Sequence, residues 1–153
     1  MKISRAARSK RRLAAMRLTS LTLRSMEYWS RLAGGYDEAM VLVAVAAIKT
    51  DKFSRAQMSE DQMDLQNPLD QSAYAKCSIS SIAEATGLNR ETARRKVNDL
   101  VERGYLERVG RSSVVFRTGF QQEAVVQEAV DAQLEAFRRT AEALVRDGIL
   151  DLV

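Results

Sequence analysis

Residues 87–100 carry the side chains of this chain that are best suited to binding a polyanion. The stretch reads GLNRETARRKVNDL and contains three consecutive cations, Arg94, Arg95 and Lys96. Glycine is favoured where a helix ends in a left-handed conformation, and asparagine is favoured just before the first turn of the next helix. In the major groove of DNA, arginine can donate two hydrogen bonds to guanine, and asparagine can pair with adenine. The order of residue types therefore predicts a tight turn between two helices, the second of which presents arginines to DNA.

The second of these helices is predicted over residues 90–103, with Asn89 as its N-cap. Its apolar residues fall at i, i+4, i+7 and i+8 and form one stripe, made of Ala93, Val97, Leu100 and Val101. A helix attached to its domain by one stripe leaves the opposite face and the N-terminus exposed. That face can enter a major groove, which is about 12 Å wide.

A shorter helix is predicted before the turn, over residues 81–86, with Ser80 as its cap. Gly87 is expected to have positive φ at the end of this helix. Beyond the second helix, residues 105–109 and 114–117 have the composition of strands. They are separated by Gly-Arg-Ser-Ser, so a hairpin with a cationic tip is predicted directly after the arginine-bearing helix.

Ten side chains on these elements are predicted to contact DNA: Ser80, Asn89, Arg90, Glu91, Thr92, Arg94, Arg95, Asn98, Arg111 and Ser112. The helix 90–103 would lie in the major groove. The hairpin tip near residues 110–113 would lie on the phosphate backbone or in the minor groove. The alternative is that arginines on an exposed helix are simply solvated or paired with neighbouring acids, and that the same face binds a protein.

Residues 78–116 resemble the winged helix-turn-helix of bacterial transcriptional regulators of the MarR, IclR or GntR type. The resemblance rests on Ile79, Ile82-Ala83, Thr86-Gly87-Leu88, Thr92, Arg94-Arg95, Val97, Leu100, Gly104-Tyr105-Leu106 and the hairpin. It covers about a quarter of the chain. It implies DNA binding by the helix 90–103 and a homodimer, and it implies nothing about a small-molecule effector.

Composition argues against metal sites and most enzyme chemistry. The chain of 153 residues has no histidine and one cysteine, Cys77. A zinc site, a Ser-His-Asp arrangement and an internal disulfide therefore lack the residues they need. Catalysis by carboxylates or lysine stays open, but we expect no enzyme, no catalytic residue, no metal and no cofactor. The single cysteine fits a reducing compartment, so a cytoplasmic location is expected.

Charge is segregated along the chain. Residues 1–25 hold eight cations and no acid, and residues 76–117 hold nine cations and five acids. Residues 26–75 and 118–153 each carry a net charge of −4. Cations gathered in two blocks suggest a polyanionic partner, and double-stranded DNA fits the central block.

The flanking segments define the remaining domain boundaries. Residues 1–26 are expected to form a basic arm, which could be a solvated tail, a segment contacting DNA phosphates, or a membrane-surface segment. Residues 37–50 predict a buried helix that is too short to span a bilayer, so no membrane segment is expected. Residues 54–76 predict a loop or short helices broken at Asn67-Pro68.

Residues 119–153 predict a long C-terminal helix, over 120–147, and an apolar tail. An apolar stripe runs along the helix at spacings of four and three: Val126, Val130, Leu134, Phe137, Ala141 and Leu144. It could pack on its own core, beside residues 37–50, or form a homodimer interface. The tail GILDLV is apolar enough to need covering, and a partner subunit is one candidate.

Together these features predict a mainly α fold with a small β-hairpin wing, a winged helix-turn-helix with flanking N- and C-terminal helices. The winged domain is expected over residues 27–118, with its helix-turn-helix at 80–103 and its wing at 105–117. The predicted function is a sequence-specific, DNA-binding transcriptional regulator, and the alternative is a winged-helix module that binds protein without DNA.

Overall fold

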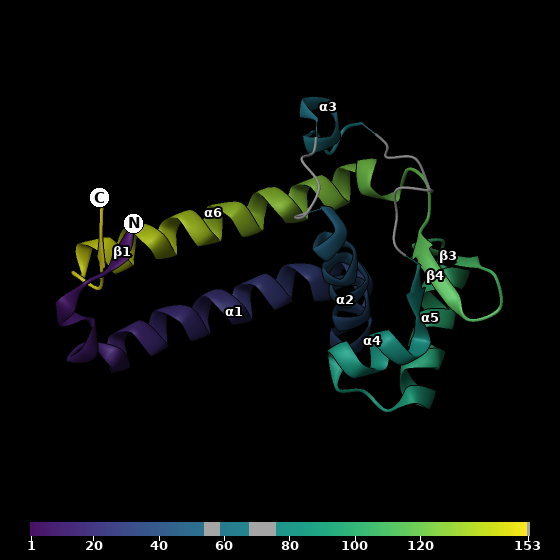
Figure 1. Cartoon of the computed structure of the whole chain (residues 1–153), viewed down its shortest axis with the longest axis horizontal. Helices are drawn as coiled ribbons and strands as arrows, with labels where there is room; N and C mark the ends of the chain where they lie inside the picture. Colours follow the sequence, from purple (N-terminus) through teal and green to yellow (C-terminus); the bar gives the residue numbers. More distant parts are fainter. Residues whose placement is uncertain (54–58, 68–75, 153) are drawn as a thin grey trace. The chain divides into compact units, whose positions relative to one another are not determined.

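The computed structural model describes residues 1–53, 59–67 and 76–152 (Figure 1). The chain divides into two compact units. The first contains Met1–Tyr28 and Glu128–Val153, and the second contains Trp29–Gln127.

The described residues form mostly helices. The α-helices are α1 (Arg11–Ala33), α2 (Tyr36–Phe53), α3 (Glu60–Met63), α4 (Ile79–Thr86), α5 (Arg90–Glu102) and α6 (Ala124–Arg146). Short 3-10 helices span Arg5–Arg8 and Phe120–Gln122. The strands are β1 (Lys2–Ile3), β2 (Cys77–Ser78), β3 (Leu106–Val109), β4 (Ser113–Phe116) and β5 (Leu150–Asp151). The predicted fold class, mainly helical with a small hairpin wing and flanking helices, is confirmed.

The second unit is built on helices α2, α4 and α5, which pack on one another and on a small sheet (Figure 1). The predicted helix over residues 37–50 is confirmed and is longer at both ends. Its apolar side chains make the centre of the core, where Ala39, Val41, Leu42, Ala44 and Val45 are buried. A helix that is apolar on most sides is expected to be buried, because it has no polar face to expose to solvent.

The wing is confirmed as the hairpin of β3 and β4, with Leu106 opposite Phe116. A third strand, β2, was not predicted. It pairs antiparallel with β4, Cys77 lying opposite Val114, so the strand order is β2-β4-β3. Two residues are too few to show a strand pattern in the sequence. This strand forms because its backbone can pair with the free edge of β4.

The turn between α4 and α5 has the predicted geometry. Gly87 ends α4 with a φ of 72°, which is the left-handed conformation that favours glycine. Asn89 caps α5, because its side-chain oxygen accepts a hydrogen bond from the Thr92 N–H at 2.8 Å. Helix α4 differs from the prediction at its start, since it begins at Ile79 and not at residue 81.

Ser80 is therefore not the cap of α4, and that prediction was wrong. The cap is Ser78, whose side-chain oxygen accepts from the Ser81 N–H at 3.0 Å. Ser78 is the last residue of β2 and has an extended backbone, which is the conformation an N-cap needs. Ser80 lies in the first turn of α4 and is exposed.

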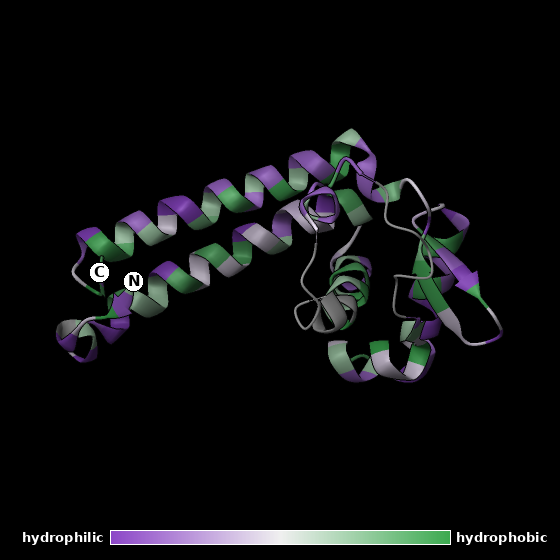
Figure 2. Cartoon of the chain, turned by 45° about the horizontal axis from the view of Figure 1, so that its top comes forward, coloured by the Kyte–Doolittle hydropathy of each residue, from purple (hydrophilic) through white to green (hydrophobic). Residues whose placement is uncertain are grey.

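In the first unit, α1 and α6 run side by side in opposite directions, and the two ends of the chain meet (Figure 1, Figure 2). Strand β1 pairs antiparallel with β5, Ile3 lying opposite Leu150. Asp147 holds the N-terminal segment, because its backbone oxygen accepts from Lys10 Nζ at 2.6 Å and its carboxylate lies 3.1 Å from Arg17 Nε. Most of the expected basic arm over residues 1–26 is thus helical and bonded to the C-terminal segment.

Part of the apolar tail is covered by the N-terminus of its own chain, although Leu152 is exposed. Ile149 is buried, and its backbone oxygen accepts from the Ser4 N–H at 3.0 Å. A partner subunit is therefore not needed to cover Ile149. The predicted C-terminal helix is confirmed as α6, but its apolar stripe is only partly buried. Leu144 is buried, whereas Leu134 and Phe137 are 64% and 54% exposed. Among the described residues, no helix is long and apolar enough to cross a membrane.

Candidate nucleic-acid interface

Helix α5 is attached to the second unit by the predicted stripe and exposes its opposite face. Ala93, Val97 and Leu100 are completely buried. Arg94 and Arg95, which follow in the sequence between the buried positions, are exposed. The stripe prediction is confirmed at these three positions, while the fourth, Val101, is only partly buried. The stripe fixes which cations α5 can present to a partner.

A polar hollow of about 350 Å³ lies where the N-terminal ends of α4 and α5 meet the wing. Its lining consists of four arginines, three serines and one isoleucine: Arg90, Arg94, Arg108, Arg111, Ser78, Ser80, Ser112 and Ile79. Three separate elements therefore contribute guanidinium groups to one hollow. Guanidinium and hydroxyl groups are the donors that bind phosphate oxygens in protein–DNA complexes.

The hollow brings together five of the ten side chains predicted to bind DNA: Ser80, Arg90, Arg94, Arg111 and Ser112. The other five, Asn89, Glu91, Thr92, Arg95 and Asn98, lie on α5 or at its cap and do not line the hollow. Ser78 and Arg108 line it without having been predicted. Residue type favours Ser80 as the cap as strongly as Ser78, and the strand position of Arg108 gives no signal of the face it occupies, so the sequence does not point to either residue.

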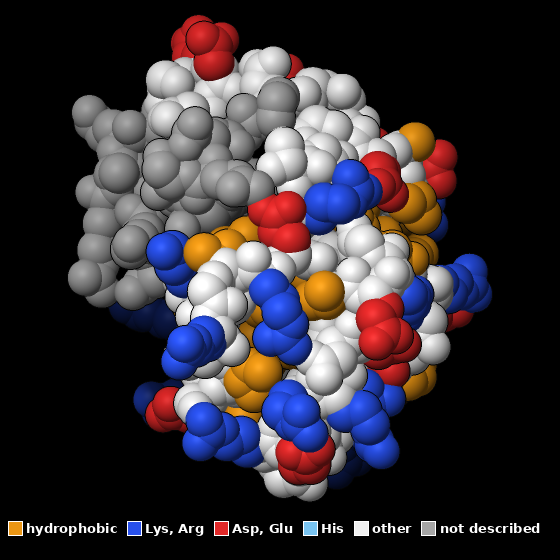
Figure 3. Space-filling view, turned by 90° about the vertical axis from the view of Figure 1, so that its right-hand side faces the viewer, with side chains coloured by type: hydrophobic (Ala, Val, Ile, Leu, Met, Phe, Trp, Pro, Cys, Tyr) orange, Lys and Arg blue, Asp and Glu red, His pale blue; other side chains and the backbone are white. Residues whose placement is uncertain are grey.

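Cationic side chains dominate the face of the second unit that carries this hollow. Figure 3 shows Lys and Arg side chains gathered over the lower part of this face, with fewer Asp and Glu between them. Figure 1 places α4 and α5 in that lower part. A surface of one dominant sign attracts an extended polyanion and guides its approach.

Arg94 is paired with Glu91 on the same helix turn. Arg94 Nη2 donates to Glu91 Oε1 at 2.6 Å, and Arg94 Nε donates to Glu91 Oε2 at 3.0 Å. These hydrogen bonds lower the pKa of Glu91, which therefore stays ionised. Both side chains are exposed, and an exposed pair of this kind contributes little to stability. Arg94 can therefore exchange Glu91 for a guanine or a phosphate at small cost.

Two asparagines of the predicted set already use their side-chain oxygens. Asn89 Oδ1 accepts from the Thr92 N–H as the cap of α5. Asn98 Oδ1 accepts from Arg108 Nη2, a hydrogen bond that ties α5 to β3. Pairing with adenine requires both the oxygen and the NH2 of the amide. In this arrangement the two amides can donate to a phosphate or a base through their NH2 groups, whereas a two-bond contact with adenine would have to share the oxygen with the hydrogen bond it already accepts.

The wing tip is held against the start of α4. Gly110 has a φ of 71° in the turn, and Arg111 and Ser112 at the tip are exposed. The backbone oxygen of Ser112 accepts from the Ile79 N–H at 3.3 Å. The tip therefore has a fixed position beside the N-terminus of α4, and Arg111 faces the same hollow as Arg90 of α5.

Other cations of the same block hold the domain together. Lys96 Nζ lies 2.6 Å from Glu38 Oε1 and joins α5 to α2. Burial raises the pKa of Glu38, but the hydrogen bond from Lys96, a backbone hydrogen bond and the positive charges of Lys96 and Arg103 together outweigh burial, and the pKa is lowered overall. Arg103 Nη1 donates to the Ala33 oxygen at 2.5 Å, and the guanidinium lies 4.6 Å from the centre of the Tyr105 ring.

Arg117 has a similar structural role, because its Nε donates to the Gly104 oxygen at 2.5 Å and its Nη2 pairs with Glu123. Lys96, Arg103 and Arg117 are thus bonded within the domain, whereas the arginines at 90, 94, 95, 108 and 111 are exposed on the face of α5 and the wing. In the part of the chain that the structure describes, no group of three or more His, Cys, Asp or Glu side chains could hold a metal ion.

One segment of the chain is similar to a known domain family. Residues 72–110 match the IclR helix-turn-helix domain. The match includes β2, α4, α5 and β3, so it covers the helix-turn-helix and about a quarter of the chain. Domains of this kind are DNA-binding domains of transcriptional regulators and are not enzymatic. No curated protein and no solved structure matches the chain.

Proposed function

We propose that this chain, which contains an IclR-type helix-turn-helix DNA-binding domain, is a sequence-specific transcriptional regulator. In this proposal α5 enters the major groove of double-stranded DNA, and the wing tip near residues 110–113 lies on the adjacent backbone or in the minor groove. The observation that carries the proposal is the hollow in which arginines from α5, β3 and the wing tip converge. A solvated helix face would not require guanidinium groups from three elements to lie together.

The arginines of the domain have two proposed roles. Those that line the hollow, at positions 90, 94, 108 and 111, would bind phosphates and fix the position of α5. Arg95 lies outside the hollow on the exposed face of α5, together with the partly exposed Thr92. These two side chains would contact base edges, Arg95 through guanine N7 and O6. Arg94 can serve either role, because it both lines the hollow and faces away from the core.

Glu91, Asn89, Asn98, Ser80 and Ser112 complete the proposed interface. Glu91 would hold Arg94 in place and could accept from cytosine N4. Asn89 and Asn98 would act through their NH2 groups, and the two serines would donate to phosphate oxygens. No catalytic residue, metal or cofactor has a part in this function.

The proposal also includes the oligomeric state and the location of the protein. Binding to two symmetric half-sites requires two recognition helices, so we expect the regulator to act as a homodimer. Because the proposed partner is genomic DNA, we expect the protein to act in the cytoplasm. The proposal assigns no effector, no operator sequence and no direction of regulation.

Selection of bound duplexes from a random DNA pool tests the proposal. We expect one motif to be enriched, and we expect a variant with Arg95 changed to alanine to enrich a relaxed form of that motif. A folded protein that enriches no motif would contradict the proposed sequence specificity.

Salt dependence separates DNA binding from the alternative of a protein-binding module. Neutralising four phosphates should give a slope of about −3.6 in the plot of log affinity against log salt concentration, because each contact contributes about −0.9. A slope near zero, with tight binding to a protein partner through the same face, would favour the alternative.

A further inference from the structure

A groove of about 610 Å³ lies within the first unit, and all of its lining residues belong to that unit. Helices α1 and α6, residues 1–8 and the segment after α6 contribute to the lining. Of the 14 lining residues, 11 are apolar, two are arginines and one is a threonine. Small-molecule sites in proteins have volumes of about 300–1,000 Å³ and mainly apolar linings with a few polar groups. The groove therefore has the size and the composition of a ligand site.

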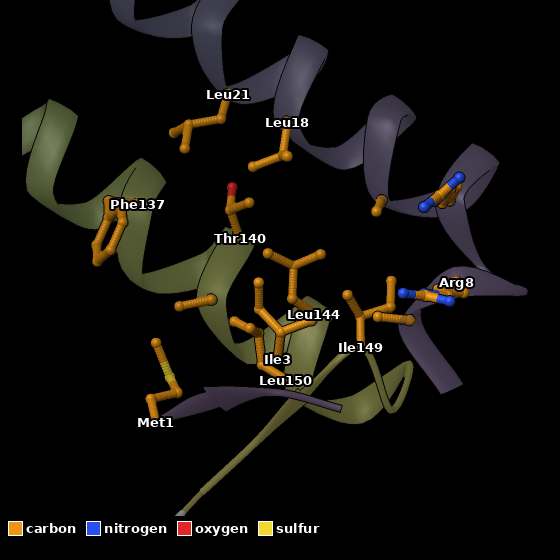
Figure 4. A pocket seen from close by; sticks show the side chains of 14 residues that line it. Met1, Ile3, Arg8, Leu18, Leu21, Phe137, Thr140, Leu144, Ile149 and Leu150 are labelled. Carbon is orange, nitrogen blue, oxygen red and sulfur yellow. The ribbon is translucent and has the colours of Figure 1, made fainter. Parts of the chain in front are cut away.

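The apolar walls of the groove are in contact with solvent. Figure 4 shows Leu18 and Leu21 of α1 pointing toward Thr140 and Leu144 of α6. The side chain of Leu18 is 50% exposed, and that of Phe137 is 54% exposed. Apolar side chains that face an open groove lack packing partners on one side. An apolar ligand in the groove would supply these contacts and remove the walls from water.

The charged part of the lining is at one end of the groove. In Figure 4 the Arg8 side chain lies near Ile149, whereas Leu21 and Phe137 lie toward the opposite end. Arg11, the other cation of the lining, is the first residue of α1 and follows Arg8 by three positions. The groove therefore has a cationic end and an apolar end, and an amphipathic anion has the complementary distribution of charge.

Both guanidinium groups of the lining are exposed and available to a ligand. In the part of the chain that the structure describes, no ion pair involves Arg8 or Arg11, whereas Arg17 of the same segment lies 3.1 Å from the carboxylate of Asp147. The described lining also contains no acid that would repel an anion. A guanidinium group can donate two parallel hydrogen bonds to a carboxylate, so a carboxylate suits this end of the groove.

The length of the groove indicates the size of the ligand. The lining residues of α1 extend over ten positions, from Arg11 to Leu21. At about 1.5 Å per residue, this part of the helix is about 15 Å long. An extended alkyl chain, with C–C bonds of about 1.5 Å, covers that length with about ten to twelve carbon atoms. A short anion such as acetate could not contact both the arginines and Phe137.

We propose that the groove binds a free linear carboxylic acid of about ten to twelve carbon atoms, its carboxylate at Arg8 and Arg11 and its chain along the apolar walls. A free acid fits better than a lipid surface, because Leu144 lines the groove but is only 8% exposed. A slender chain that enters the groove can contact Leu144, whereas the surface of a bilayer would contact only the exposed rim. This inference goes beyond the DNA-binding function, since every residue in it belongs to the first unit.

Isothermal titration calorimetry of the full chain with octanoate, decanoate and dodecanoate, each below its micelle concentration, tests the proposal. We expect saturable binding of one decanoate per chain. The affinity should rise by up to about fourfold for each CH2 group that the groove buries. Decan-1-ol has the apolar chain without the charge, so it should bind about tenfold more weakly than decanoate. No saturable binding by the folded chain, or equal affinity for decan-1-ol, would overturn the proposal.

A pair of double variants tests the assignment of the cationic end. Arg8→Gln/Arg11→Gln should weaken decanoate binding about tenfold and leave decan-1-ol binding unchanged. The matched control is Arg5→Gln/Arg12→Gln, which removes the same charge from the same segment at two exposed residues that do not line the groove. The control should bind decanoate as the unchanged chain does. Equal losses in the two double variants would show a general effect of charge and would contradict the site.

A second pair of variants tests the groove itself. Ala14→Leu places a larger side chain in the lining and should weaken decanoate binding about tenfold or more, whereas Ala15→Leu, at an exposed position outside the lining, should not. Circular dichroism checks the helical content of both, and Ala141→Leu on the opposite wall replaces Ala14→Leu if that variant unfolds. Unchanged binding by a folded groove variant would refute the assignment.

Two further outcomes separate this inference from its neighbours. Binding to vesicles of phosphatidylglycerol without binding of free decanoate would identify a lipid surface as the partner and overturn the proposal. A chain that binds decanoate but enriches no DNA motif would leave this inference standing while the proposed function fails.

Discussion

Replacing Arg94 with alanine should weaken DNA binding while leaving the domain folded, and replacing Arg103 should do the reverse. Among the described residues Arg94 bonds only to Glu91, through an exposed pair whose loss should change stability little. For a chain of 153 residues this corresponds to a fall in Tm of about 2 °C or less. A contact with guanine or phosphate is worth about 1–3 kcal/mol, so the affinity for a selected site should fall roughly 5- to 150-fold.

Arg103 is the matched control, because it is the C-cap of the same helix but bonds within the domain. It donates to the Ala33 oxygen and to Asp99, and it lies over the Tyr105 ring. Truncating it leaves the Ala33 oxygen without this donor, which should cost about 1–3 kcal/mol and lower the Tm by roughly 3–10 °C. Its DNA affinity, measured well below the Tm, should change less than that of Arg94→Ala.

Fluorescence anisotropy with a labelled selected duplex at fixed salt, together with thermal unfolding followed by circular dichroism, gives both quantities for each variant. The reasoning is refuted if Arg94→Ala binds as tightly as the unchanged chain. It is refuted equally if Arg94→Ala lowers the Tm as much as Arg103→Ala does, because the Arg94 side chain would then be structural.

Three further predictions follow from the same geometry. Arg111→Ala should weaken binding to selected and scrambled duplexes alike and flatten the salt slope by about 0.9, as measured by titration at several salt concentrations; an effect confined to the selected duplex would contradict a phosphate contact. Gly87→Ala should destabilise the domain by about 1 kcal/mol or more, because φ at Gly87 is 72°, and an unchanged Tm would contradict that conformation. The Glu38–Lys96 pair should stabilise the domain above pH 4.5 and lose this contribution as the pH falls through the lowered pKa of Glu38, so Glu38→Gln should unfold with a weaker acid dependence than the unchanged chain.

The sequence was sufficient to predict those features of the fold that depend on residues close together in the chain. The cap at Asn89, the positive φ of Gly87 and the buried stripe of Ala93, Val97 and Leu100 depend on neighbours within a few positions. Residue type and spacing therefore determine them. The same holds for helix α2, whose apolar run allows little other than burial.

The structure was needed to find those features that depend on contacts between residues far apart in the chain. Lys96 is one of three consecutive cations, yet it bonds to Glu38, which is 58 positions away. Strand β2 depends on β4, and the place of Ser78 as a cap depends on that strand. Arg108 reaches the hollow only because β3 pairs with β4 and lies against α5.

The N-terminal residues are the clearest case of a distant cause. Their composition suggests a basic arm, and nothing near them in sequence provides a partner. Arg17 finds one in Asp147, 130 positions away, and β1 finds one in β5. Their helix is therefore fixed by the other end of the chain, which no local pattern can show.

The specificity ratio of the full chain tests the central claim most directly. It is the affinity for a duplex selected from a random pool divided by the affinity for a scrambled duplex of the same length and composition, both at about 150 mM salt. Direct contacts of α5 with base edges predict a ratio of about 1,000 or more. A ratio near one for a folded protein would contradict sequence recognition by α5, and the absence of binding to either duplex would contradict DNA binding altogether.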